Sequence, residues 1–160
     1  MPTESTPTNP LPPRKSFTSA LLRATLTTVL CACLIVMVHG FISWGLDRDI
    51  VPEDDANVLV IIAMAAASVL VIFFAVLGGL TPERVGTASV TRALLAAVAV
   101  HVLTPAAGAL AYIIVTARLF AFADFFGSHL LSPFVLATSL VTLVCTLLLP
   151  LVGRIHSAPR

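Results

Sequence analysis

Residues 57–80 read NVLVIIAMAAASVLVIFFAVLGGL, an apolar run without one charged side chain. A helix of about 20 apolar residues spans about 30 Å of hydrocarbon. Three further runs, over about residues 19–46, 90–116 and 130–152, are similarly long, and none has Asp, Glu or Lys in its interior. Backbone groups in lipid must bond within their own segment, so we expect these runs to be helices. The sequence predicts an all-α fold, a four-helix transmembrane bundle.

The composition supports this class. Of 160 residues, 58% are hydrophobic and 11% are charged, whereas soluble domains have roughly 25% charged residues. We expect a disordered, proline-rich cytoplasmic tail over residues 1–16, a membrane domain over 17–153 and a short cytoplasmic tail over 154–160. These polar segments leave no room for a soluble catalytic domain. The net charge of +1 argues against a nucleic-acid partner, which needs clustered Lys and Arg.

The positions of Lys and Arg predict the orientation. Seven of these residues lie on the side of the two termini, and Arg48 and Arg118 lie on the other side. Basic residues concentrate in cytoplasmic segments. We therefore expect a multi-pass protein of the cell membrane with both termini in the cytoplasm.

Small residues mark where helices are expected to pack. Helices in lipid associate by close van der Waals contact, which small side chains permit. Alanine pairs four residues apart lie on one helix face. Such pairs occur in the second and third spans: Ala63/Ala67, Ala93/Ala97 and Ala107/Ala111. The second and third spans are therefore predicted to form the tight centre.

His101, Thr104 and Pro105 form a candidate polar site within the third span. Pro105 has no N–H, so the carbonyl of His101 loses its usual helical partner. One interpretation is a proline kink with a neutral histidine bonded to a backbone carbonyl. The other is a site that handles a proton, a quinone or a solute in mid-membrane.

A haem between His39 and His101 is not expected. Counted from the span boundaries, the two residues differ in depth by roughly 13 Å, whereas two axial imidazoles need nearly the same depth. Cys31 and Cys33 lack further ligands at zinc spacing. We predict no cofactor and no metal site, and leave open a bound lipid.

Two segments on the predicted outer side are candidates for contacts. The acidic loop has the carboxylates Asp47, Asp49, Glu53, Asp54 and Asp55. It is interpreted as a solvated loop, a divalent-cation site or a docking site for a basic partner. The second segment has the aromatic residues Phe120, Phe122, Phe125 and Phe126. It is expected either to anchor at the membrane interface or to contact a partner.

Resemblances narrow the function further. Four spans in a short chain resemble the small multidrug resistance exporters, but the first span lacks their membrane-embedded Glu. The acidic loop resembles the outer-loop carboxylates of lipid-linked-sugar glycosyltransferases, which have many more spans. The Ala/Val/Leu-rich spans and the tail ending in Pro12-Pro13-Arg14-Lys15 resemble small actinobacterial membrane proteins of unassigned role. Proteins of that kind occur as accessory subunits of larger membrane assemblies.

The sequence therefore predicts a non-enzymatic accessory subunit that packs on a larger integral membrane complex, with a respiratory-chain assembly as the most specific candidate. Membrane lipids are expected partners, and homo-oligomerisation is left open. One alternative is a small transporter or lipid-handling protein that uses the polar site near His101. Another is an enzyme that acts on a lipid through the acidic loop.

Overall fold

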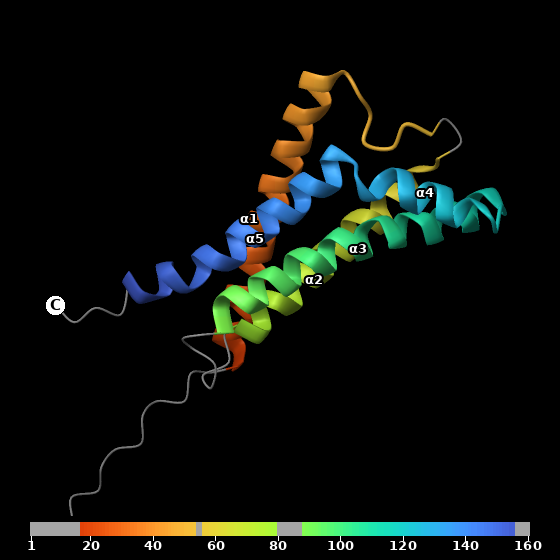
Figure 1. Cartoon of the computed structure of the whole chain (residues 1–160). Helices are drawn as coiled ribbons and strands as arrows, with labels where there is room; N and C mark the ends of the chain where they lie inside the picture. The colour runs from red at the N-terminus through yellow and green to blue at the C-terminus, as the bar shows by residue number, and fades with distance from the viewer. Residues whose placement is uncertain (1–16, 54–55, 80–87, 156–160) are drawn as a thin grey trace, which may run out of the picture.

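A computed structural model describes residues 17–53, 56–79 and 88–155. Within these ranges the chain forms five helices and no strand (Figure 1). They are α1 (Phe17–Leu46), α2 (Val58–Gly79), α3 (Ala88–Thr116), α4 (Ala121–Leu130) and α5 (Pro133–Ile155). The predicted all-α fold is confirmed. The tail over residues 1–16, residues 156–160, Asp54 and Asp55 lie outside the described residues.

Three of the helices, α1, α2 and α3, are long and apolar enough to cross a membrane. Their ends agree with the first three predicted spans to within two residues. The fourth predicted span differs, because α4 and α5 meet at a bend of 59° and count as one span only if the bent pair is taken together. The chain thus has three to four apolar helices of membrane-spanning character.

Local chemistry explains where the helices stop. Asp47 and Ala117 have φ angles of 48° and 55° and follow the last residues of α1 and α3. A left-handed residue directly after a helix is a common way to end it. Pro133 opens α5, where its missing N–H does no harm, and its ring disfavours helical geometry at Ser132. The break between α4 and α5 therefore lies where the proline requires it.

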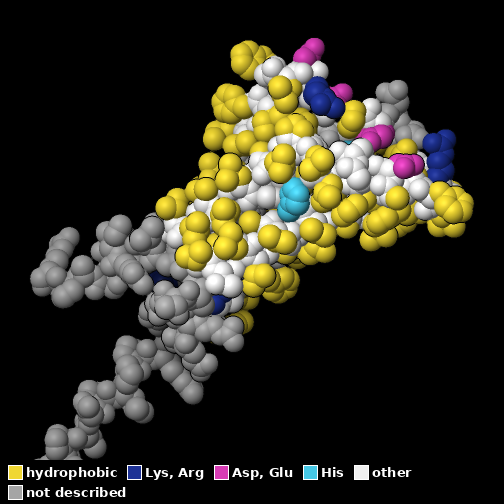
Figure 2. Space-filling model, in the orientation of Figure 1, with side chains coloured by type: hydrophobic (Ala, Val, Ile, Leu, Met, Phe, Trp, Pro, Cys, Tyr) yellow, Lys and Arg dark blue, Asp and Glu magenta, His cyan; other side chains and the backbone are white. Residues whose placement is uncertain are grey.

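The helices form one bundle with two distinct ends. α2 and α3 lie side by side, α5 packs on α3, and α1 contacts both α2 and α5 (Figure 1). We call the end that carries α4 and the segment between α1 and α2 the α4 end, and the opposite end, where α3 begins, the Arg92 end. Figure 2 shows apolar side chains over the middle of the visible face and the visible acidic side chains near the α4 end.

Two clusters of buried side chains form the core. At the α4 end, α2, α3, α4 and α5 contribute Val60, Met64, Ala109, Tyr112, Phe125 and Val135. Toward the Arg92 end, α1, α2 and α3 contribute Ala24, Cys31, Ile72, Val76 and Val100. The buried side chains of α1 are Ala24, Thr28 and Cys31, all in its first half. The second half of α1 therefore adds no fully buried side chain to this core.

Gly108 of α3 lies in close contact with α2 and α4. A Cβ atom at this position would lie 2.7 Å from Met64 Cγ and 3.0 Å from Phe125 Cε1. Of the predicted alanine positions, Ala93 is fully buried, and the others are half-buried: Ala63, Ala67, Ala97, Ala107 and Ala111. The structure thus places a glycine at a tight contact that the alanine pattern does not identify.

Buried threonines follow one face of α5. Thr138, Thr142 and Thr146 are spaced four residues apart and are all buried. Their hydroxyls donate to the carbonyls four residues earlier, at 2.8, 2.8 and 2.7 Å. This threonine face therefore satisfies its hydroxyls within α5 itself.

Candidate functional site

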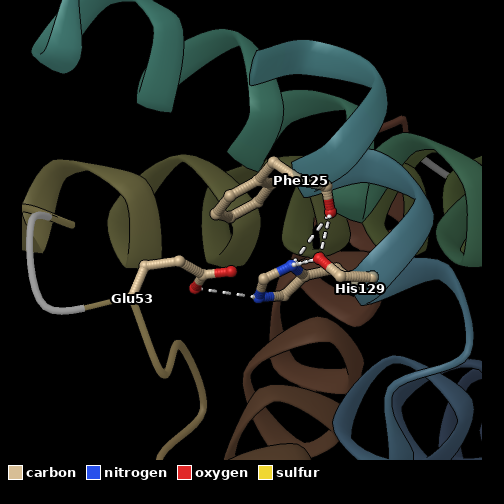
Figure 3. A network of polar contacts seen from close by, with 4 residues as sticks. Glu53, Phe125 and His129 are labelled. Atoms are coloured by element: carbon tan, nitrogen blue, oxygen red, sulfur yellow. Dashed lines mark hydrogen bonds and ion pairs between the residues drawn. The ribbon is translucent and has the colours of Figure 1, made fainter.

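An acid–base pair lies at the α4 end. His129, near the end of α4, is 3% exposed, and its Nε2 lies 3.6 Å from Oε2 of Glu53 (Figure 3). Both atoms are buried, and neither has a hydrogen-bond partner among the described residues. A separation of 3.6 Å is too long for a hydrogen bond. Buried polar atoms without a partner are uncommon in folded proteins, so this pair is the strongest candidate site.

The contacts of Nδ1 define the tautomer of His129. Nδ1 lies 3.0 Å from the carbonyl oxygen of Phe125, which also accepts from the Ser128 hydroxyl at 2.9 Å (Figure 3). A carbonyl only accepts, so Nδ1 carries the hydrogen, and a neutral His129 points a lone pair from Nε2 at the Glu53 carboxylate. Two acceptors that face each other repel. The contact is attractive only when the pair holds one further proton.

Aromatic stacking holds the imidazole in place. The rings of His129 and Phe125 are stacked, with centroids 4.0 Å apart and an interplanar angle of 11°. Phe125 in turn stacks on Tyr112 of α3, with centroids 4.9 Å apart. We call Tyr112, Phe125 and His129 the aromatic column. It links the acid–base pair to the core at the α4 end.

A cavity of about 160 Å³ adjoins the pair. The segment after α1 lines it with Arg48, Asp49 and Glu53, and the corner between α4 and α5 adds His129 and Ser132. Within the residues that the structure describes, no group of three or more His, Cys, Asp or Glu side chains could hold a metal ion. The arrangement places a carboxylate and an imidazole side by side at a cavity with both polar and apolar lining residues.

Two further histidines, His39 of α1 and His101 of α3, bond to α5. His39 Nε2 lies 2.8 Å from Thr138 Oγ1 and 3.1 Å from the Phe134 carbonyl oxygen, and His101 Nδ1 lies 3.3 Å from Ser139 Oγ. The hydroxyls of Thr138 and Ser139 already donate to backbone carbonyls, so both imidazoles act as donors here. Each histidine therefore joins its helix to α5.

The span boundaries predict a depth offset of roughly 13 Å between these histidines, whereas their side chains contact α5 at neighbouring positions. Their partners Thr138 and Ser139 are consecutive residues, whose heights on a helix differ by about 1.5 Å. α1 and α3 diverge at the α4 end (Figure 1), so positions counted from the ends of these two helices are not directly comparable. The histidines approach different sides of α5, since consecutive residues point about 100° apart.

The structure brings Thr104 and His101 to different neighbours. Thr104 is buried, and its hydroxyl lies 2.7 Å from Ser68 Oγ of α2. Ser68 donates to the carbonyl of Met64, so Thr104 is the donor to Ser68. Pro105 is fully buried within a helix that continues to Thr116. The predicted polar site is thus divided, with Thr104 facing α2 and His101 facing α5.

The predicted contact residues at the α4 end also separate. Phe125 is 3% exposed and belongs to the aromatic column, whereas Phe120 is 95% exposed. Phe122 and Phe126 are half-buried and stack on each other at 5.8 Å. Of the described acidic residues, Glu53 turns inward to His129, and Asp47 and Asp49 are exposed. The segment therefore combines core residues with exposed ones.

His129 is the site residue that sequence reasoning missed. Its burial depends on a contact with Glu53, which is distant in the chain. The available signal was local, because Phe125 and His129 are four residues apart on one helix and such aromatic pairs lie on the same face.

Comparisons with known proteins give a family but no role. Neither a curated protein nor a solved structure matches the chain. The model of DUF6121, a family of unknown function, matches residues 14–159. The apolar helices are those of a membrane protein. Because the family model matches most of the chain, the chain belongs to the DUF6121 family.

Proposed function

We propose that the chain is a non-catalytic subunit that packs on a larger membrane complex through the second half of α1. The observation that carries this proposal is that all buried side chains of α1 lie in its first half. In the second half Met37, Phe41 and Trp44 are 52%, 65% and 86% exposed. This half-helix is apolar and contributes little to the chain's own core, so its surface is available for a partner.

The composition of this surface favours a protein over lipid alone. Cys33, Met37, Gly40 and Trp44 follow one another at helical spacing on exposed positions of α1. Small residues allow a second helix to approach closely, and tryptophan is enriched among the residues that dominate binding energy at interfaces. The polar side chains within the bundle support a structural role, because His39, His101 and Thr104 bond to neighbouring helices.

The proposal includes a topology and a class of partner. Taken as one broken span, α4 and α5 give four crossings. In the sequence, Lys and Arg are more numerous in the segments on the side of the two termini, which supports cytoplasmic termini. We propose no cofactor beyond bound lipid, and a respiratory-chain assembly as the most specific partner.

Purification in mild detergent with mass spectrometry tests the proposal. A Cβ added at Gly40 meets nothing within 4 Å, so Gly40→Leu changes the outer surface of α1 without disturbing the fold. The matched control is Ala66→Leu, on an exposed position of α2. We expect a stoichiometric membrane partner with the wild type and the control, and its loss with Gly40→Leu. A chain that purifies alone, or only with copies of itself, would refute the proposal.

Transport is the second candidate. His101 is partly exposed on α3, within an apolar span. A histidine in that position can bind a proton or a polar solute. His101→Ala separates the two functions, because unchanged assembly with lost flux favours transport. Lost assembly, or no effect, favours the structural role.

A further inference from the structure

A groove of about 380 Å³ lies between α2 and α3 toward the Arg92 end. Its lining is apolar except for one arginine. The large side chains that border it are well exposed: Leu70 at 55%, Phe74 at 63% and Leu95 at 65%. Small side chains lie between them: Ala75, Ala96 and Ala99. The groove is therefore an open depression on the surface, with small residues along its floor and large residues on both sides.

Arg92 closes one end of this groove. The Nη1 atom of Arg92 is 2.8 Å from where a Cβ of Gly79 would be, so its guanidinium rests against the last residue of α2. Arg92 lies two residues inside the apolar span Val90–Thr116, which puts it at the edge of the hydrocarbon. A guanidinium has five N–H donors and matches the geometry of phosphate oxygens. Arg92 can therefore contact Gly79 and still present donors to a phosphate.

We propose that this groove binds an anionic phospholipid, with one acyl chain along α3 and the phosphate on Arg92. From Arg92 to Ala99 the helix rises about 10 Å. One leaflet has about 15 Å of hydrocarbon, half of a core about 30 Å thick. The groove covers about two-thirds of one leaflet from its edge, which suits a lipid seated in that leaflet and is too short for a path across the membrane.

Charge complementarity selects the headgroup. Basic pockets between transmembrane helices bind anionic headgroups. A zwitterionic lipid offers the same phosphate but adds a cation next to Arg92. The groove therefore favours phosphatidylglycerol over phosphatidylcholine, and the preference depends on both the arginine and the open floor.

Native mass spectrometry of the full-length protein, incubated with phosphatidylglycerol or phosphatidylcholine, tests this site without any protein partner. We expect phosphatidylglycerol to bind more tightly, and Arg92→Gln to weaken its binding about five-fold, which corresponds to about 1 kcal/mol for one basic residue near a membrane surface. Arg23→Gln is the matched control, because Arg23 is an exposed arginine toward the same end. It should leave the binding unchanged.

A second variant tests the groove itself. Ala99→Leu fills the floor and keeps Arg92, so it should also weaken phosphatidylglycerol binding, whereas Ala66→Leu, outside the groove, should not. Equal binding of both lipids to the wild type would overturn the proposal. So would equal losses from Arg92→Gln and Arg23→Gln, or full binding by Ala99→Leu, because each shows that no built site exists.

Discussion

Replacing Gly108 by alanine should destabilise the bundle, because this position has no room for a methyl group. The new Cβ would lie 2.7 Å from Met64 Cγ, 2.8 Å from its sulfur and 3.0 Å from Phe125 Cε1. Overpacking of this kind costs about 1–3 kcal/mol. Alanine also gains about 0.8–1.0 kcal/mol of helix propensity over glycine. Gly40→Ala is the matched control, because its Cβ meets nothing within 4 Å.

Subtracting the control removes the propensity gain, which both variants share. We therefore expect Gly108→Ala to be less stable than Gly40→Ala by about 1–3 kcal/mol in equilibrium unfolding with SDS in mixed micelles. In a Met64→Ala background the substitution should cost less, because the nearest atoms are gone, with a coupling energy of about 0.5–3 kcal/mol. If Gly108→Ala stabilises the protein as much as Gly40→Ala, the close contact between α2, α3 and α4 is absent and the reasoning fails.

Three further predictions concern other contacts. When the pair holds one further proton, His129 and the Glu53 carboxylate attract each other. His129→Phe keeps the stacking on Phe125 but removes this attraction, so it should weaken docking of the segment after α1 by about 1–3 kcal/mol. Faster amide hydrogen exchange in that segment measures this, and an unchanged rate would contradict it. Thr104→Val removes the hydroxyl that donates to α2 and should cost about 0.6 kcal/mol, at most about 1.7, in the same SDS unfolding assay; a larger loss would contradict the assignment. Cys145 of α5 packs against the core cluster that contains Cys31 of α1, so a short bifunctional thiol reagent should crosslink α1 to α5 within one chain, seen as a mass shift in the intact protein. Cys33→Ser should retain this crosslink, and Cys145→Ser should lose it.

The helical part of the fold could be predicted from the sequence because length and uninterrupted apolarity are local properties. α1, α2 and α3 end close to the predicted residues, since polar segments or left-handed residues stop them. The fourth span was less predictable, because Leu130 and Pro133 lie in one apolar run. Where the proline interrupts that run, the chain bends by 59°, and the size of such a bend is not encoded in hydropathy.

The candidate site was predictable only in part. Glu53 stood out as one of several acids in a polar loop, but nothing local distinguished it from Asp49. The distinction comes from tertiary structure, since Glu53 faces His129 of α4. In the same way, the position of His101 relative to His39 could not be obtained by counting residues from the ends of their spans. The two helices, α3 and α1, diverge, so equal counts do not mean equal height in the bundle.

The threonine face of α5 has a consequence for how relatives of this chain can differ. The hydroxyls of Thr142 and Thr146 donate to backbone carbonyls of α5 itself. Valine or serine can therefore replace either residue without leaving a polar group of another helix unpaired. Thr138 is different, because its oxygen also accepts from the imidazole of His39, at 2.8 Å, a shorter contact than that to the Phe134 carbonyl oxygen. We expect substitutions at Thr142 and Thr146 to occur independently in evolution, and changes at Thr138 to accompany changes at His39.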